Sequence, residues 1–525
     1  MFLIRPVESI RTLLTYDLHT HDRHSLYEQL YLGIRNDIEH DQLHAGDRLP
    51  SKRTLAQHLG VSVITVENAY RQLIAEGYIE AHERRGYFVS ELPSLPRRHD
   101  TPQHHEKDDE ATETKTGEAT PLLADFSGTH RSGNLFPFSI WSKTVRQTLS
   151  EASKGRLLRT SYDTFGAEEL RRAIAQHLAD LRGIDVAAER IVIGAGAQDL
   201  YGVLVQLLGR DRTFAVEDPG YPALRIHYEL SGATVRPIPV DEKGMVVSEL
   251  RKTPASIAHC TPAHQFPTGS VLSADRRREL LAWANEGDKQ QKRYIIEDDY
   301  DSEFRMRGRP IPPLYAHDVH ESVIYLNTFT RSLGSVFRIA YMVLPTHLVP
   351  LFRERFAARS CTVGALEQLE LARFIESGNY ERHVNRQRTV YRRLQDDLMA
   401  LLAASDAGAY LRFRGVDAGL HFLMDVDLSP LQKSEAGGLC PHTHERDEQS
   451  PYETLEQRAL EAGIRLVRVD DYRSTPLTQE SSSPERKKSS HERMTYVMNL
   501  SGLDAKRADE IGRSLARVIE SLRSI

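Results

Sequence analysis

The sequence predicts two folded units of different class: a small helical unit that ends in a β-hairpin, and a large α/β unit. A polar stretch, Pro93–Pro121, divides the chain. Before this stretch, apolar residues recur at helical spacing and a hairpin pattern follows them. After it, helical periodicity alternates with short β-branched runs, which is typical of a mainly parallel sheet covered by helices.

The composition is that of an ordinary globular protein. The 525 residues are 40% hydrophobic and 27% charged with a formal net charge of −6, so any nucleic-acid contact requires a local basic patch. Cys260, Cys361 and Cys440 lie far apart, which disfavours a disulfide framework and favours a reducing cytoplasm. No run approaches the roughly 20 apolar residues of a membrane span, and Met1–Ile10 lacks the apolar core of a signal peptide, so we expect no membrane partner.

The same composition sets the expected boundaries. We expect an N-terminal extension, a compact unit, a disordered linker and a second folded region, at 1–24, 25–92, 93–121 and 122–525. Two polar surface insertions, 429–451 and 473–493, interrupt the second region. The linker and the first insertion contain the possible metal ligands His104, His105, Cys440, His442 and His444. Their spacing is not that of a known metal site, so we expect no bound metal.

The small unit has the pattern of two short helices joined by a tight turn. Ser25–Ile38 carries an apolar stripe at helical spacing, and a turn is expected at 46–50. Ser51 and Ser62 are each expected to cap a short helix, and Gly60 separates these helices. This is the helix-turn-helix pattern, in which the second helix enters the major groove of DNA.

A two-stranded wing completes the small unit, with strands expected at Tyr78–Ala81 and Tyr87–Ser90. The whole unit resembles the GntR-type winged helix. The matching positions are Leu49-Pro50-Ser51, Arg53, Leu55-Ala56, Leu59, Val61-Ser62, Thr65-Val66, Leu73, Gly77-Tyr78 and Gly86-Tyr87-Phe88-Val89.

The resemblance implies that this unit binds DNA. The expected contacts lie at the two helix starts and in the wing: Ser51, Lys52, Arg53, Ser62, Val63, Ile64, Thr65, Arg84 and Arg85. Val63 stands where the family often has a basic residue, so contact with a thymine methyl group, or reliance on Arg53 and the wing, is expected instead. Because acidic residues leave the unit without net positive charge, a winged helix used for protein contact is the alternative.

Motifs in the large unit appear in the order found in fold-type I, pyridoxal phosphate (PLP)-dependent aminotransferases. The region from about Phe126 to Leu503 resembles the effector part of the MocR subgroup of GntR regulators. The motifs are Asn134-Leu-Phe-Pro-Phe138, Tyr162-Asp-Thr-Phe-Gly166, Ile193-Gly-Ala-Gly-Ala-Gln198, Glu217-Asp-Pro-Gly-Tyr-Pro222, Thr261-Pro-Ala-His-Gln-Phe-Pro-Thr-Gly269 and Ile296-Glu-Asp-Asp-Tyr-Asp-Ser-Glu-Phe304. This resemblance implies that the region folds into a large domain with a mainly parallel sheet and a smaller α+β lobe.

The resemblance also assigns roles in a cofactor site. Ala195, Gly196 and Ala197 open a helix whose free amides cradle a phosphate. Against the pyridine ring, Tyr221 stacks and Asp298 pairs with the ring nitrogen. The remaining implied contacts are His264 or Gln265 and Tyr300 near the ring hydroxyl, Thr328 and Arg338 at the phosphate, and Tyr162 at the phosphate of a neighbouring subunit.

One position departs from the family in a way that changes the chemistry. The family has a Ser or Thr, two residues, the Schiff-base lysine, and an arginine seven positions later. Here the stretch is Thr328-Phe-Thr-Arg331 followed by Arg338, so Arg331 occupies the lysine position. An arginine stays protonated and cannot form the covalent bond to the cofactor aldehyde. The sequence therefore predicts PLP binding without a covalent bond, or binding of another anionic ligand.

A second departure concerns the arginine that holds the substrate carboxylate in aminotransferases. Thr495 aligns with that position and Arg493 lies two residues before it. Arg225, after the Tyr221 motif, is an alternative carboxylate ligand.

These observations predict a DNA-binding transcription regulator whose aminotransferase-like domain senses a small molecule, either PLP-like or amino-acid-like. The resemblance implies a homodimer, and two winged helices per dimer imply two operator half-sites. An aminotransferase with a DNA-binding appendage is the alternative, which Arg331 opposes. A third reading is a structural DNA-binding dimer with an inactive sensor.

Overall fold

The computed structural model divides into two compact units, within Met1–Thr114 and Lys115–Ile525. It describes residues 14–16, 18, 25–82, 85–91, 122–128, 135–152, 163–286, 292–308, 311–417, 419–428, 451–474 and 493–524. The predicted linker, most of both insertions, Arg84 and Tyr162 lie outside the described residues.

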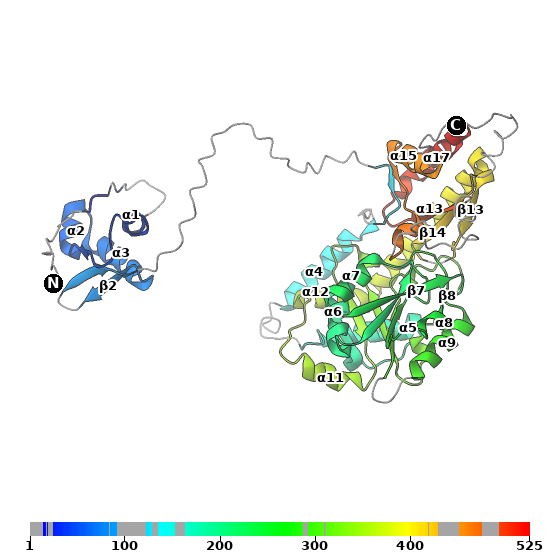
Figure 1. The fold of residues 1–525 in the computed structure, drawn as a ribbon, viewed down its shortest axis with the longest axis horizontal. Helices are drawn as coiled ribbons and strands as arrows, with labels where there is room; N and C mark the ends of the chain where they lie inside the picture. The colour runs from blue at the N-terminus through cyan, green and yellow to red at the C-terminus, as the bar shows by residue number, and fades with distance from the viewer. Residues whose placement is uncertain are drawn as a thin grey trace, which may run out of the picture. The chain divides into compact units, whose positions relative to one another are not determined.

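The first unit is built on three helices, α1 (Leu26–Glu39), α2 (Lys52–Leu59) and α3 (Val63–Ala75), which Figure 1 shows in blue. The apolar stripe of α1 is buried at Leu30, Ile34 and Ile38, as the periodicity predicts. Both predicted caps are present. The side chain of Ser51 accepts from the Thr54 amide, and that of Ser62 accepts from the Thr65 amide.

A three-stranded antiparallel sheet of order β1-β3-β2 packs beside these helices. The wing strands are β2 (Ile79–His82) and β3 (Gly86–Val89), within a residue or so of the predicted limits. The segment expected to be only a turn contains strand β1 (Arg48–Leu49), which pairs with Phe88 and Tyr87 of β3. Two residues are too few to show a strand periodicity in the sequence.

Part of the predicted N-terminal extension packs on the winged helix. The side chain of Leu14 is buried in the core of this unit. The hydroxyl of Tyr16 donates to Asp37 at 2.6 Å, across the outer side of α1. The core of the unit therefore includes residues that precede α1.

The second unit contains an eight-stranded sheet of order β5-β12-β11-β10-β9-β6-β7-β8. The strands are β5 (Ile191–Gly194), β6 (Thr213–Asp218), β7 (Thr234–Asp241), β8 (Gly244–Met245), β9 (Ile257–Cys260), β10 (Tyr294–Asp298), β11 (Val323–Thr328) and β12 (Ala340–Val343). The neighbours from β7 to β11 pair in parallel, whereas β12 and β8 run antiparallel to their partners. The predicted large, mainly parallel sheet is confirmed.

Helices cover both faces of this sheet because successive strand residues point to opposite sides. In β10, Ile296 packs in the cluster with α6 and α7, whereas Ile295 packs in the cluster with α9. The helices of this region are α5 (Glu168–Arg182), α6 (Ala197–Leu208), α7 (Pro222–Leu230), α8 (Val247–Leu250), α9 (Ala274–Asn285), α10 (Thr330–Leu333), α11 (Leu348–Arg355) and α12 (Ala365–Glu376).

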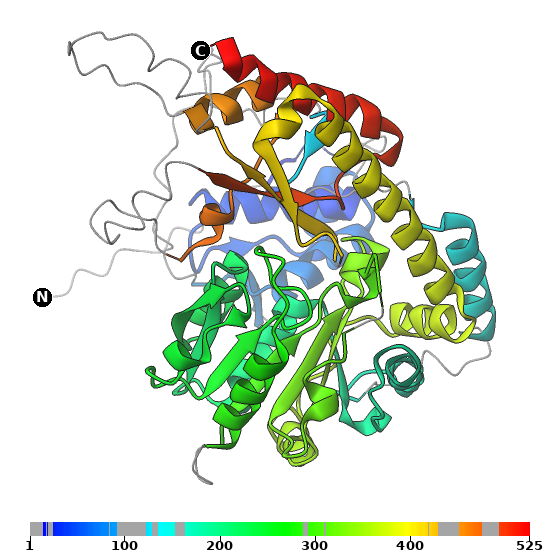
Figure 2. The same cartoon turned by 90° about the vertical axis from the view of Figure 1, so that its right-hand side faces the viewer.

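A smaller α+β lobe follows. Its antiparallel sheet has the order β13-β14-β16, formed by Leu411–Arg414, His421–Val426 and Met494–Asn499. The long helix α13 (Asn379–Ala404) lies beside α17 (Ala508–Glu520) over this sheet (Figure 2). The remaining elements are α4 (Phe138–Ala152), α15 (Pro451–Glu461), β4 (Ala124–Asp125) and β15 (Ile464–Arg465).

Among the described helices, none combines the length and the apolar character that a membrane crossing requires.

Candidate functional site

The DNA-facing candidates lie at the starts of α2 and α3. Ser51 and Ser62 use their side-chain oxygens to cap these helices, at 3.2 and 3.1 Å from the amide nitrogens. At the start of α3, the neighbouring side chains of Val63 and Ile64 are 43% and 69% exposed. They form an apolar tip on the helix that would enter the major groove.

The basic side chains expected to contact DNA differ in whether a carboxylate of the protein already pairs with them. The ammonium group of Lys52 lies 2.9 Å from Glu67, so its charge is already shared with a carboxylate. Arg53 is exposed, and within the described part of the chain no carboxylate pairs with it. Arg85 is also exposed, and its guanidinium lies 5.9 Å from the centre of the Phe88 ring in the wing.

In the second unit, the predicted phosphate contacts come together at the start of α6. Gly196 precedes the helix with a φ of +85°, and a Cβ there would lie 2.9 Å from Nη2 of Arg338. Arg338 donates to Gln198 at 3.4 Å, and Thr328 lies at the end of β11 with its hydroxyl 3.0 Å from that of Thr330. Two of the three predicted cradle amides are engaged within the protein: the Ala195 amide donates to Asp199 at 3.0 Å and the Gly196 amide donates to the Gly194 carbonyl at 2.8 Å. The Arg338 guanidinium, the hydroxyl groups and the amides at the start of α6 from Ala197 onward are the donor types that suit a phosphate.

Asp199 fixes the turn that precedes α6. Its carboxylate accepts the Ala195 amide at 3.0 Å and the Thr362 hydroxyl at 2.6 Å, and it pairs with Arg359 at 2.7 Å. Asp199 therefore holds the turn in place and occupies the Ala195 amide that the sequence assigned to the phosphate.

Asp298, at the end of β10, is buried and has one satisfied and one free oxygen. Oδ2 accepts from the Tyr201 hydroxyl at 3.1 Å and lies 3.4 Å from Nε2 of His259. Oδ1 is buried and has no hydrogen-bond partner among the described residues. A buried carboxylate oxygen without a donor fits the protonated nitrogen of a pyridine ring.

Tyr201 and His259 were not anticipated from the sequence. Tyr201 lies on α6, and His259 is a polar residue inside the buried strand β9. The Tyr228 hydroxyl lies 2.7 Å from Nδ1 of His259 and so extends this chain of contacts behind Asp298. A histidine within an otherwise apolar strand was the available sequence signal.

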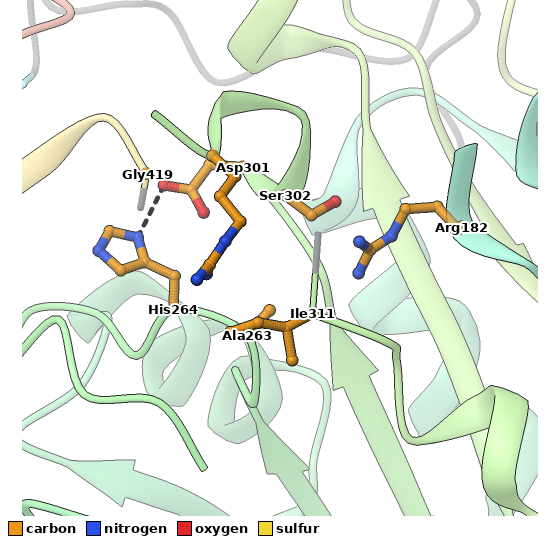
Figure 3. A pocket seen from close by; sticks show the side chains of 8 residues that line it. Arg182, Ala263, His264, Asp301, Ser302, Ile311 and Gly419 are labelled. Carbon is orange, nitrogen blue, oxygen red and sulfur yellow. Dashed lines mark hydrogen bonds and ion pairs between the residues drawn. The ribbon is translucent and has the colours of Figure 1, made fainter. Parts of the chain in front are cut away.

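His264 does not stand free in the site, because it is bonded to Asp301. Nδ1 of His264 lies 2.9 Å from Asp301, as the dashed line in Figure 3 marks. Burial alone would raise the pKa of Asp301, but attraction to His264 and His421 lowers it below its usual value. Gly419 lies against this pair, and a Cβ on it would come within 1.9 Å of His264 Nδ1.

The cavity in Figure 3 has room for about one water molecule, with a volume of about 10 Å³. Arg182 lies on the opposite side of this cavity from His264. Its guanidinium pairs with the buried Asp299 at 2.7 Å. The cavity is therefore too small for a cofactor and forms part of the polar packing behind the site.

His264, Asp301 and His421 form one group of metal-ligand side chains among the described residues, with ligand atoms within 4.8 Å of one another. The 2.9 Å separation of His264 and Asp301 is that of a direct hydrogen bond. Two ligands on one Zn²⁺ ion, each at about 2.0–2.2 Å, are held further apart than this. We therefore interpret the group as a hydrogen bond between His264 and Asp301, with the ring of His421 packed against that of His264 at 4.2 Å between centres.

Arg331 lies in α10 and is half-buried. Its guanidinium lies 5.5 Å from the centre of the Tyr300 ring, close to the cation–π range. The His264 ring stacks on the same tyrosine with 6.4 Å between ring centres. Arg331, at the position of the family's lysine, therefore lies next to Tyr300 in the structure. The resemblance assigns both positions to the same cofactor site.

Tyr221 is 44% exposed and lies at the start of α7, beside Phe266. Tyr472, on the segment Val469–Tyr472 that follows β15, packs edge-on against Phe266 with 4.8 Å between ring centres. The amide of Gly220 donates to the carbonyl of Tyr472, which joins this segment to the Tyr221 loop. The exposed Tyr221 ring is thus available for stacking.

Gln265 is a structural residue. It is 1% exposed, and its side-chain amide donates to Glu217 and to the carbonyl of Pro219. Burial raises the pKa of Glu217 to about 7, although hydrogen bonds from Thr261 and Gln265 oppose this rise. His264 and Gln265, the two alternatives expected near the ring hydroxyl beside Tyr300, are thus both hydrogen-bonded to other residues of the protein.

The three candidate carboxylate ligands are engaged elsewhere. Thr495 donates to Asp425 at 2.7 Å, Arg493 lies 3.7 Å from Asp427, and Arg225 lies 3.5 Å from Glu229. The first two contacts lie on the small-lobe sheet, and the third is within α7.

Comparison with known proteins shows the family. Residues 26–89 match the model of bacterial regulatory proteins of the gntR family, and residues 133–440, more than half of the chain, match aminotransferase class I and II. The chain is 36% identical to the HTH-type transcriptional regulator YdeL of Bacillus subtilis, over 77% of this chain and 84% of that protein.

The chain belongs to the MocR-type subgroup of GntR regulators. It is 29% identical to the probable rhizopine catabolism regulatory protein MocR of Rhizobium meliloti, over 72% of this chain and 77% of that protein. It is 32% identical to the pyridoxine biosynthesis regulator PdxR of Corynebacterium glutamicum, over 78% of this chain and 85% of that protein. This GntR-family chain is therefore an HTH-type transcriptional regulator with an aminotransferase-like domain, as the sequence predicts.

Solved structures support the fold of that domain. The chain superposes on the kynurenine aminotransferase of Pyrococcus horikoshii with a TM-score of 0.59 and 21% identity, over 77% of this chain and 92% of that one. The multiple substrate aminotransferase of Thermococcus profundus gives a TM-score of 0.60 and 22% identity, over 78% and 93%. The aminotransferase class I and II fold normally binds PLP.

Proposed function

We propose that the second unit of this regulator is a sensor that holds PLP, or a related phosphorylated pyridine, without a covalent bond. Binding of this ligand changes the affinity of the winged helix for its DNA operator. A ligand can do this only if it binds two conformations of the regulator with different affinity.

The observation that carries the proposal is the combination of Arg331 with an otherwise suitable site. Arg338, Thr328 and the start of α6 supply phosphate donors, and Asp298 supplies a buried oxygen that has no partner among the residues the structure describes. When bound, PLP supplies an electron-withdrawing ring to reactions in which a lysine is its covalent partner. Arginine cannot supply that amine, because its guanidinium remains protonated at physiological pH.

The alternative function, transamination, requires an amine that accepts and returns a proton at the substrate carbon. Within the described residues, the side chain at the lysine position is the half-buried Arg331, which lies over Tyr300. We therefore propose recognition rather than turnover as the role of this site.

In the DNA-binding unit, we propose that Arg53 and Arg85 supply the charge and that Val63 and Ile64 contact thymine methyl groups. The exposure of Val63 and Ile64 supports this, since an apolar tip gains by burial in the major groove. Lys52 contributes less because Glu67 already balances its charge. Ser51, Ser62 and Thr65 lie at the helix starts, where backbone amides face phosphates.

We also propose that the regulator acts as a homodimer on two operator half-sites. The aminotransferase-like fold supports this proposal, since two copies of the second unit would carry two winged helices. The chain on either side of the winged helix sets how far apart the half-sites lie.

Titration of the purified protein with PLP tests the proposal. Calorimetry measures binding, and borohydride reduction followed by mass spectrometry detects any covalent adduct. We expect saturable binding with no adduct on the native chain and an adduct on the Arg331→Lys variant. An adduct on the native chain would show that another lysine replaces the missing one, and absence of binding would contradict the sensor proposal.

A further inference from the structure

We infer that Arg331 makes this sensor selective for ligands that carry a carboxylate on the branch at ring carbon 4, in addition to the 5′-phosphate. This inference rests on the proposed function and specifies the ligand class of the same site. In this inference, Arg331 adds a preference for a carboxylate, in addition to removing the lysine that would bond to the cofactor.

The guanidinium of Arg331 lies over the ring of Tyr300, a residue that the resemblance places at the cofactor site. It lies 5.5 Å from the centre of the Tyr300 ring. Burial lowers the pKa of His421 well below its usual value, and the charges of His264 and Arg331 lower it further. Burial raises the pKa of Tyr472 to about 12, and the charge of Arg331 opposes this rise. Arg331 therefore lies beside Tyr300, and its charge also acts on His421 and Tyr472, which come from other segments.

No carboxylate pairs with Arg331 within the described part of the chain. Other arginines near the site do have acidic partners: Arg182 pairs with Asp299, and Arg359 pairs with Asp199, both at 2.7 Å. A half-buried guanidinium loses part of its hydration and gains by pairing with an anion. The unpaired cation is therefore a binding group that the protein itself leaves unused.

The nearest acidic groups are already committed. Asp301 accepts from His264 at 2.9 Å and from the Leu420 amide at 3.1 Å. One oxygen of Asp298 accepts from Tyr201, and its free oxygen is the group we assign to the ring nitrogen. Asp301 can therefore neutralise Arg331 only by giving up these contacts, and no ion pair joins Asp298 to Arg331 among the described residues.

The position of Arg331 indicates which part of the ligand it meets. By the motif resemblance, Arg331 occupies the position of the lysine that bonds to the cofactor aldehyde, which is the substituent on ring carbon 4. With the ring nitrogen at Asp298 and the phosphate at Arg338, that substituent is the part left for Arg331. A planar guanidinium binds a carboxylate through two parallel hydrogen bonds, accepts a neutral aldehyde oxygen through one, and repels an ammonium group.

The predicted order of affinity follows from these charges. Ligands with a carboxylate on this branch bind most tightly, PLP with its neutral aldehyde is intermediate, and pyridoxamine phosphate with its ammonium group binds least. Two sources supply the same carboxylate chemistry, namely an oxidised ring compound and an amino acid joined to the ring. The ester 4-pyridoxic acid 5′-phosphate represents the first, and N-(5′-phosphopyridoxyl)-L-leucine represents the second.

The test is a calorimetric titration of the full chain with these two compounds, PLP and pyridoxamine phosphate. We expect at least one carboxylate compound to bind about 10-fold or more tightly than pyridoxamine phosphate. Comparison of the two carboxylate compounds identifies the source. In Arg331→Gln and Arg331→Met, this preference should fall to about 3-fold or less, while binding of PLP itself shows that the site is still folded.

Arg225→Gln is the matched comparison, because Arg225 is the other candidate ligand for a carboxylate and lies on α7. We expect the preference to survive in this variant. Its loss in Arg225→Gln and not in the Arg331 variants would overturn the inference, as would equal affinities for all four compounds in the native chain. If none of the four compounds binds, the proposed function fails and this inference fails with it, whereas binding without preference contradicts the inference alone.

Discussion

The hydroxyl of Tyr201 donates to Oδ2 of Asp298 at 3.1 Å, and the second oxygen of that carboxylate, Oδ1, is buried and has no partner within the part of the chain that the structure describes. Tyr201 lies on α6, the helix whose start forms the predicted phosphate cradle. In the proposed site, one helix would orient the carboxylate for the ring nitrogen and place its start at the phosphate. The distance between these two parts of the helix would then set the length of the ligand that the proposed site accepts.

Asp298→Asn should weaken binding of PLP, because an amide cannot form a charged hydrogen bond with the protonated ring nitrogen. Charge-assisted hydrogen bonds are roughly twice as strong as neutral ones, so we expect a loss of about 10-fold or more in affinity. Calorimetric titration measures the loss. Tyr201→Phe, which removes only the orienting hydroxyl, should cost less; an unchanged dissociation constant in Asp298→Asn would show that the ring nitrogen lies elsewhere.

Arg338→Gln should reduce affinity for phosphorylated ligands only. Its guanidinium lies beside Gly196 at the start of α6, where the phosphate is placed. We expect PLP to bind at least 10-fold more weakly, whereas any weak binding of pyridoxal, which has no phosphate, stays unchanged. Titration of both compounds into both proteins separates the phosphate contribution. Equal losses for PLP and pyridoxal would indicate a general disturbance of the site instead.

Arg53→Ala should weaken operator binding more than Lys52→Ala does, because Glu67 already pairs with Lys52. We expect operator affinity to fall by about 10-fold or more in Arg53→Ala and by about 3-fold or less in Lys52→Ala. Fluorescence anisotropy on a DNA sequence selected from a random library measures both losses. Ile64→Ser should relax sequence preference with little change in salt dependence. Arg71→Ala is the control, since Arg71 is a 73% exposed side chain further along α3; an equal loss there would reject the assignment to Arg53.

Glu217→Gln should make the stability of the second unit less sensitive to pH. The folded-state pKa of Glu217 is about 7 against a usual value of 4.5, so its neutral form stabilises the fold and this contribution is lost as pH rises through 7. A glutamine cannot ionise. Between pH 5 and pH 8 the free energy of unfolding of Glu217→Gln should therefore rise relative to the native chain, by roughly 2–3 kcal/mol.

Denaturant unfolding followed by tryptophan fluorescence measures this change. Trp141 and Trp283 both lie in the second unit, so the signal reports on that unit. The exposed Glu242→Gln should follow the native chain at every pH. A difference between Glu217→Gln and the native chain that is independent of pH would mean that Glu217 does not change its protonation over this range.

The parts of the fold that depend on local chemistry could be predicted from the sequence. Ser51 and Ser62 cap their helices through bonds to amides three residues away, and such spacing is visible in the chain. The β-branched runs of the large unit predict strands at Arg190–Ile193, Thr213–Val216, Tyr294–Ile296, Val323–Leu326 and Ala340–Leu344. Strands β7 and β9 are therefore additional to those that the sequence predicts. Pro237 and Pro239 interrupt the first and His259 the second, and pairing with neighbouring strands stabilises both.

Residues of the candidate site could be predicted from the sequence only where they belong to a family motif. Tyr201 and Asp298 are separated by 97 positions, so their hydrogen bond follows from the sheet order rather than from any spacing in the chain. His421 and Tyr472 come from the small lobe, and the sequence gives no sign that they approach His264 and Phe266. The predicted contacts from Tyr162 and Arg84 lie outside the described residues and stay predictions.

The central claim is that ligand binding in the second unit controls operator binding by the first. The most direct test measures operator affinity of the full chain by fluorescence anisotropy, with and without a saturating concentration of the tightest ligand found by calorimetry. We predict a change of about 5-fold or more in the dissociation constant, which the Asp298→Asn variant loses at the same ligand concentration. An identical dissociation constant with the ligand demonstrably bound would contradict the account and leave the second unit as a structural part of the regulator.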